Sequence, residues 1–222
     1  MSAESEHSGD HPAGPTVGIV LAAGAGTRMG RPKALVVGHD REPWLRRAVR
    51  VLSAGGCAEV IVVLGAAADD ARALLSPGLD GSPTAPAGPS ATPVATTHVV
   101  VTDHWADGLS ASLRAGLDAA RALGAAAAVV TLVDLPWLTA GAVQRLLTPH
   151  PLSTTLRQAV YDGRPGHPVV IGRVHFEALI ATLHGDVGAR PYLAAQGAET
   201  VDCTDLGGGD DVDSPRGQLD AG

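Results

Sequence analysis

Apolar runs and helix-like segments alternate along this chain. The runs are short and uninterrupted, as is typical of strands buried on both faces of a sheet. They cover residues 17–23, 59–64, 98–101 and 125–133. Apolar residues at helical spacing follow at residues 43–54, 67–75, 110–123 and 140–147. Strands that alternate with helices favour a parallel sheet, so we predict a Rossmann-like three-layer α/β sandwich with helices on both faces. The most apolar run, residues 125–133, should be its central strand.

The pattern changes in the last third of the chain. Residues 156–161 and 166–171 resemble two strands around the Asp162–Gly163 turn, which predicts a small β-ribbon. Helices at residues 174–183 and 189–195 and a short strand at residues 199–203 follow. The sheet is therefore expected to be mostly parallel rather than wholly so.

Three segments lack any periodic pattern. Residues 1–15 are polar and acidic, which predicts a disordered tail. Residues 76–97 are rich in proline, glycine, serine and threonine, which predicts a flexible insertion, with a lid as the alternative. Residues 216–222 form a short glycine-containing tail. One domain is therefore expected over residues 16–215.

Composition narrows the classes of partner. The 222 residues carry a formal net charge of −7, which argues against a general nucleic-acid-binding surface. No apolar run approaches the roughly 18 residues of a membrane helix, and the first residues do not resemble a signal peptide. Cys57 and Cys203 match neither a metal site nor a disulfide framework. We therefore expect a cytoplasmic protein with a small-molecule ligand.

A glycine-rich loop follows the first predicted strand. Gly24, Gly26 and Gly30 are interspersed with the cations Arg28, Arg31 and Lys33. Such a loop can turn sharply and offer backbone N–H groups to an anion. The third glycine comes one residue too late for a dinucleotide fingerprint, and the loop lacks the Gly-Lys-Ser/Thr of a Walker A motif. A triphosphate is therefore the favoured ligand, and a dinucleotide-binding oxidoreductase is a disfavoured alternative.

Asp134 directly follows the most apolar predicted strand, in the sequence Asp134-Leu135-Pro136. Open α/β sheets bind ligands at this edge, and an ionised carboxylate there needs a cation. Mg²⁺ held by carboxylate and substrate phosphate is the favoured cation, and a loop cap is the alternative.

Residues 21–33 resemble the signature loop of the MobA-like nucleotidyltransferases, and within them the molybdenum-cofactor cytidylyltransferase branch. The resemblance implies the fold of the nucleotide-diphospho-sugar transferases and a loop that wraps a nucleoside triphosphate. The implied catalytic residues are Arg28 and Lys33, on the phosphates, and Asp134, on the metal. The implied nucleotide-binding residues in the loop are Leu21, Ala22, Ala23, Gly24, Gly26, Thr27, Arg28 and Lys33.

Later segments extend the resemblance. A W-x-x-G-x-S-x-S segment implies nucleotide contacts from Gly108, Ser110 and Ser112, and Ser110 is expected to cap the following helix. The alternative for this segment is a capped helix without a ligand. The family's G-x-P-V and G-D-x-G-A-R segments imply acceptor binding by His167, Pro168, Asp186 and Arg190, with Asp186 as a second helix cap. A D-x-D-x-P segment implies that Asp211 and Asp213 join Asp134 at the metal, and a plain acidic tail is the alternative.

The resemblance implies one reaction. An acceptor phosphate attacks the α-phosphorus of a nucleoside triphosphate and pyrophosphate leaves, in the presence of Mg²⁺. CTP is the implied donor and molybdopterin the implied acceptor. The alternatives are guanylyl transfer to molybdopterin or to a small phosphorylated carboxylic acid, and a noncatalytic accessory protein of a molybdoenzyme.

Overall fold

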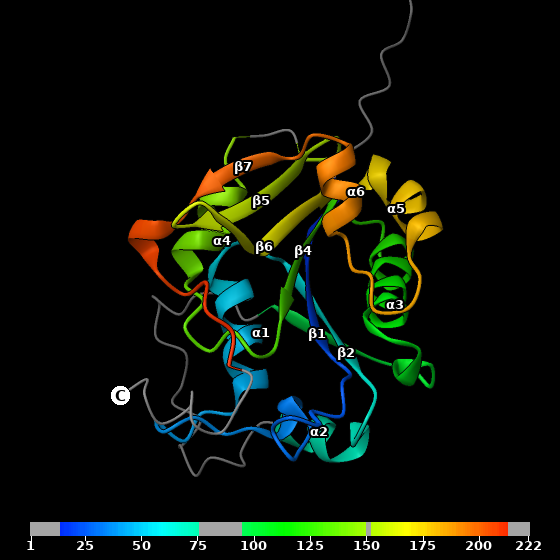
Figure 1. The fold of residues 1–222 in the computed structure, drawn as a ribbon, viewed down its shortest axis with the longest axis vertical. Helices are drawn as coiled ribbons and strands as arrows, with labels where there is room; N and C mark the ends of the chain where they lie inside the picture. Colours follow the sequence, from blue (N-terminus) through cyan, green and yellow to red (C-terminus); the bar gives the residue numbers. More distant parts are fainter. Residues whose placement is uncertain (1–13, 76–94, 150–151, 213–222) are drawn as a thin grey trace, which may run out of the picture.

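One sheet forms the centre of the molecule. The computed structural model describes residues 14–75, 95–149 and 152–212, and within these ranges seven strands lie in the order β3-β2-β1-β4-β6-β5-β7 (Figure 1). They are β1 (Thr16–Ala22), β2 (Glu59–Leu64), β3 (Thr96–Val101), β4 (Ala127–Leu132), β5 (Leu156–Tyr161), β6 (Arg164–Gly172) and β7 (Glu199–Asp202). Only β6 runs against its neighbours in this part of the chain, so the sheet is mostly parallel, as predicted.

Helices cover both faces of the sheet, which confirms the predicted three-layer fold. Figure 1 shows α1 and α4 on one face and α3 and α5 on the other. The helices are α1 (Trp44–Ala54), α2 (Ala68–Leu75), α3 (Leu109–Ala122), α4 (Ala140–Leu146), α5 (Phe176–Thr182) and α6 (Arg190–Ala195). Short 3-10 turns are η1 (Lys33–Leu35), η2 (Trp105–Asp107), η3 (Arg173–His175) and η4 (Thr204–Leu206). No helix in the described ranges has the length and hydrophobicity to cross a membrane.

Side chains on the two faces of β1 pack into two separate hydrophobic cores. Val20 and Ala22 pack with the residues of α1 and α4, whereas Ile19 and Leu21 pack with those of α3 and α5. Such a strand must be apolar at every position, because successive side chains point to opposite faces. This burial on both faces explains the uninterrupted apolar run at the start of the chain. The same reasoning holds for β4, the central strand.

The predicted hairpin forms, but it is built into the main sheet rather than standing beside it. Asp162 and Gly163 both have positive φ, 49° and 74°, as a tight turn between twisted strands requires. β6 then pairs antiparallel with both β5 and β4. The apolar residues of β6, Val169 to Ile171, explain this placement, because they are 0–3% exposed and complete both cores.

Most of the predicted tails and insertion lie outside the described residues, which exclude residues 1–13, 76–94 and 213–222. β3 begins at Thr96, two residues earlier than predicted.

Candidate active site

β1 and β4 are parallel neighbours, so the loops that follow them leave the sheet at the same edge. Leu21 is paired with Leu132, and the Val133 N–H donates to the Leu21 carbonyl at 3.2 Å. The register therefore brings the glycine loop beside Asp134, although the two are far apart in sequence.

The glycine loop turns back on itself at Gly26. This residue has φ +62°, and a Cβ there would lie 1.9 Å from the Arg31 carbonyl oxygen. The Met29 N–H donates to the Gly26 carbonyl at 2.9 Å, and the Met29 side chain is 6% exposed within the core. The loop is therefore tight at Gly26 and anchored by Met29, which fixes the start of η1 at Lys33.

Lys33 and Asp134 meet at this edge of the sheet. Lys33 Nζ lies 2.6 Å from Asp134 Oδ2, and the two side chains are 19% and 11% exposed. The other carboxylate oxygen, Asp134 Oδ1, is buried and has no hydrogen-bond partner among the described residues. Because an unpartnered buried carboxylate oxygen is costly, this atom is suited to a cation that binds with the substrate.

A cavity of 240 Å³ opens over this pair. Five of the predicted nucleotide-binding residues line it, together with Asp134; they are Leu21, Ala22, Gly24, Gly26 and Lys33. Ala23 is 3% exposed, and its carbonyl accepts from the Ala66 N–H. Thr27 and Arg28 are exposed on the loop. The cavity therefore combines glycine backbone, a cation and a carboxylate, which suits a phosphate with a bound metal.

The start of α3 reaches the same cavity through Leu109. The prediction that Ser110 caps this helix is wrong. Gly108 is the N-cap residue, with φ +104°, and Ser110 lies inside the first turn. Gly108 suits this place because a Cβ would lie 2.5 Å from the Gly185 backbone. The Ser110 N–H donates to the Gly185 carbonyl at 3.1 Å, so residue 185 satisfies one of the N–H groups that lack a partner within the helix at its start.

The predicted nucleotide and acceptor segments therefore touch at Gly108 and Gly185. Ser110 is 6% exposed and lines a second cavity, of 400 Å³, with Arg114 and Gly185, and Ser112 is 5% exposed. Neither serine lines the cavity over Lys33 and Asp134.

Asp186 makes no helix cap, because Ala189 is the N-cap residue of α6 without a side-chain hydrogen bond, so that prediction is also wrong. Asp186 and Arg190 are both exposed.

His167, on β6, lies close enough to Asp134 to be affected by its charge. Its carbonyl accepts from the Tyr161 hydroxyl at 2.9 Å, and Pro168 is buried. Burial lowers the pKa of His167 to about 4, against the opposing effect of the Asp134 carboxylate. The imidazole is therefore neutral at pH 7, and it can serve as a hydrogen-bonding group rather than as a fixed cation.

The segment that carries Asp211 also approaches Asp134. The Val212 N–H donates to the Asp134 carbonyl at 3.0 Å. The Asp211 residue, however, lines a separate cavity of 290 Å³ with Tyr161 and Arg164, and Asp213 lies outside the described residues. The contact of this segment with Asp134 is therefore made by the Val212 backbone.

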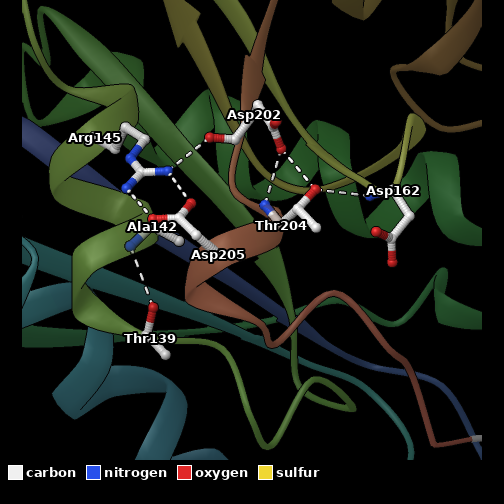
Figure 2. A network of polar contacts seen from close by, with 7 residues as sticks. All are labelled: Thr139, Ala142, Arg145, Asp162, Asp202, Thr204 and Asp205. Atoms are coloured by element: carbon white, nitrogen blue, oxygen red, sulfur yellow. Dashed lines mark hydrogen bonds and ion pairs between the residues drawn. The ribbon is translucent and has the colours of Figure 1, made fainter.

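A network of polar contacts lies just before the Asp211 segment along the chain (Figure 2). Arg145 of α4 binds both oxygens of Asp205, at 2.5 and 2.8 Å, and donates to the Asp202 carbonyl. Asp202 accepts from the backbone and hydroxyl of Thr204, whose Oγ1 accepts from the Asp162 N–H. The network therefore ties η4 to α4 and to the β5–β6 turn, and η4 leads directly into the segment that contacts Asp134.

A divalent cation fits this site with few protein ligands. In the described ranges, no three histidine, cysteine or acidic residues cluster as a complete metal site. Among the described residues, Asp134 offers one carboxylate oxygen without a partner, and phosphate and water are the ligands that usually complete the coordination of Mg²⁺.

Sequence reasoning missed three features of the site. These are the direct contact of Lys33 with Asp134, the hydrogen bond from Ser110 to Gly185, and the place of Leu109 and Val133 in the cavity wall. Each depends on contacts between segments far apart along the chain. Only the order of the strands could have indicated the first of them.

Comparison with known proteins places these features in a family. The model of the MobA-like NTP transferase domain matches residues 18–201. A curated relative, "Nicotine blue oxidoreductase" of Paenarthrobacter nicotinovorans, is 35% identical over 209 residues, covering 89% of this chain and 91% of the relative.

Solved structures with a similar fold include a mycobacterial protein, Rv0371c. The crystal structure of Rv0371c from Mycobacterium tuberculosis H37Rv matches with a TM-score of 0.70 at 28% identity, covering 94% of this chain and 97% of that chain. A structure of Rv0371c in complex with manganese matches with a TM-score of 0.60 at 26% identity, covering 85% and 86%. The chain belongs to the MobA-like NTP transferase family.

Proposed function

We propose that this protein transfers a nucleotidyl group from a nucleoside triphosphate, with CTP as donor, to the phosphate of molybdopterin. The observation that carries the proposal is the 2.6 Å contact between Lys33 and Asp134 beneath the glycine loop, with Asp134 Oδ1 left without a partner in the described ranges. One oxygen of Asp134 orients the lysine, and the other remains for a metal.

The residues of the site have distinct roles in this reaction. The glycine loop and Lys33 bind the triphosphate and hold its α-phosphorus near Asp134. Arg28, exposed on the same loop, adds positive charge where the leaving pyrophosphate develops negative charge. A divalent cation on Asp134, Mg²⁺ in this proposal, would neutralise phosphate charge and orient the leaving group.

The acceptor needs no protein nucleophile. An oxygen of its phosphate, already ionised at pH 7, forms the new bond to the α-phosphorus while the bond to the pyrophosphate oxygen breaks. Neutral His167 is suited to donate a hydrogen bond to the acceptor rather than to remove a proton, and we assign the same face to Pro168. We assign Gly108, Ser110 and Ser112 to the nucleotide, Asp186 and Arg190 to the acceptor, and Asp211 and Asp213 to the metal, each as a part of this proposal.

A screen of the four nucleoside triphosphates with Mg²⁺ or Mn²⁺, read out as pyrophosphate release with and without molybdopterin, tests the proposal. We expect release that needs both metal and acceptor, and a preference for CTP over GTP of about tenfold, the effect of one unmatched hydrogen bond. A preference for GTP would show that the nucleotide donor is a purine, and the proposed reaction would otherwise stand. Phosphoenolpyruvate, used in place of molybdopterin, tests the alternative acceptor class of small phosphorylated carboxylic acids.

A second candidate function has a specific observation in its favour. The relative at 35% identity carries the name "Nicotine blue oxidoreductase". An oxidation–reduction at this site would use a nicotinamide dinucleotide in place of a triphosphate. Consumption of NADH or NADPH in the presence of nicotine blue, without pyrophosphate release from any triphosphate, would favour this candidate. Binding of nucleotide without either turnover would favour the noncatalytic accessory role.

A further inference from the structure

A separate cavity of 200 Å³ lies on the α1 face of the molecule. Trp44, Arg47 and Trp137 line it, together with the loop at Gly38 and Asp40. The chain contains three tryptophans, and two of them are in this wall. Trp44 is 3% exposed, whereas Trp137 is 37% exposed and accessible to a ligand. The cavity therefore offers aromatic surface for stacking.

Arg47 brings an unused hydrogen-bond donor to the same wall. Its Nη2 pairs with Asp40 and lies 3.3 Å from Glu42. Its Nε is withdrawn from solvent and finds no partner among the residues that the structure describes. Burial, and then the nearby charge of Arg50, lowers the pKa of Arg47, which is consistent with a guanidinium that has lost part of its hydration. An acceptor atom bound beside Arg47 would satisfy this donor.

The position of the cavity connects it to the candidate active site. Trp137 is only three residues from Asp134, a span of at most about 11 Å. Gly38 lies just beyond η1, which begins at Lys33. Trp44 and Arg47 of α1 line the cavity, whereas Leu109 is the first residue of α3. Figure 1 shows α1 and α3 on opposite faces of the sheet. A nucleotide placed against Gly108 and Leu109 therefore leaves this cavity unfilled.

Its size limits what it can hold. Pockets for whole drug-sized ligands measure about 300–1,000 Å³, so this cavity suits only part of a substrate. A cavity of about 150 Å³ holds one benzene ring, so one or two fused rings fit here.

We propose that this cavity binds the planar heteroaromatic ring of the acceptor substrate, stacked on Trp137, with a ring carbonyl accepting from Arg47 Nε. The inference rests on the proposed function only for the identity of the substrate that carries the ring. It names two specificity-determining residues outside the glycine loop and outside the segments that the sequence indicated for the acceptor. It also implies an acceptor that bears a fused ring system rather than a small phosphorylated carboxylic acid.

The test uses pterin-6-carboxylate, a bicyclic ring with a carbonyl and without phosphate, titrated by calorimetry into the full chain without nucleotide or metal. We expect saturable binding that Trp137→Ala weakens about tenfold, the effect of one lost stacked pair, and that Trp137→Phe largely restores. Arg47→Lys keeps the positive charge but removes Nε, and it should weaken binding by a similar factor. Val174→Ala, a matched surface control at an exposed residue of η3, should leave binding unchanged. Thermal unfolding of each variant checks that it folds.

The result separates this inference from the proposed function. Absence of binding to the wild type, or equal binding by wild type and Trp137→Ala, would overturn the ring site whatever the pyrophosphate assay gives. Binding that depends on Trp137 in a protein that releases no pyrophosphate would keep the ring site and overturn the proposed reaction. In an active protein, Trp137→Ala should raise the KM for molybdopterin about tenfold while the KM for CTP stays constant.

Discussion

A methyl group added at Gly26 should weaken nucleotide binding at least about a hundredfold without unfolding the protein. The Cβ of an alanine there would lie 1.9 Å from the Arg31 carbonyl oxygen and 3.2 Å from the Lys33 nitrogen, whereas real Cβ atoms keep at least 3.0 Å. The loop must therefore move by about an ångström, and Lys33 moves with it. The left-handed backbone adds about 1–2 kcal/mol of strain. Gly26→Val should have a larger effect of the same kind.

The cost in binding follows from the contacts that Lys33 and the loop N–H groups make. Each hydrogen bond to a charged group contributes about 1.5–3 kcal/mol, so losing two of them weakens binding at least about a hundredfold. Gly30→Ala is the matched control, because Gly30 also has positive φ, +71°, but no atom of the described residues lies within 4 Å of the place that a Cβ would take there. It should lower the free energy of unfolding by about 1–2 kcal/mol and leave binding within a few fold.

Calorimetry of CTP binding in the presence of Mg²⁺, with thermal unfolding of both variants, measures these effects. Normal CTP affinity in a folded Gly26→Ala protein would refute the idea that this loop forms a phosphate cradle. Equal losses in the Gly26 and Gly30 variants would show that backbone strain, rather than the collision with Arg31, is responsible.

Three further predictions concern other parts of the chain. Lys33→Ala should weaken CTP binding by up to about 3 kcal/mol, measured by calorimetry, whereas Lys33→Arg should retain part of it. Because the folded pKa of His167 is about 4, below its ordinary 6.5, stability should be complete above pH 6.5 and fall toward pH 4. The free energy of unfolding, measured with denaturant across this pH range, should fall by up to about 3 kcal/mol. His167→Gln should make this free energy less dependent on pH. Replacing residues 83–93 with a short Gly-Ser linker should change activity only a few fold, and selective loss of acceptor affinity would instead show a lid.

The sequence predicted those parts of the fold that local patterns determine. The strands at residues 59–64 and 16–22 are buried on both faces, so their apolar runs were unambiguous. The Asp162–Gly163 turn was recognisable because its residues tolerate positive φ. The incorporation of β6 between β4 and β5 could not be predicted, because a hairpin has the same local pattern inside or beside the main sheet.

The helix caps show the same limit. Ser110 and Asp186 have the residue types that cap helices, and the sequence favours them for that reason. In the structure the Ser110 N–H is satisfied by the Gly185 carbonyl, 75 residues further along the chain. A tertiary contact thus satisfies an N–H group at the start of this helix, and single-sequence patterns carry no signal for it. The contact of Lys33 with Asp134 across 101 residues is likewise a product of strand order.

The most direct test of the central claim is pyrophosphate release from CTP and molybdopterin by wild-type protein and by Asp134→Asn. The asparagine keeps the size of the side chain and can still accept a hydrogen bond from Lys33, but it removes the charge proposed to hold the metal. We predict metal-dependent release by the wild type and a loss of at least about a hundredfold in the variant, with unfolding temperature nearly unchanged. Release by Asp134→Asn at close to the wild-type rate would contradict the assignment of Asp134 to the metal and to the reaction.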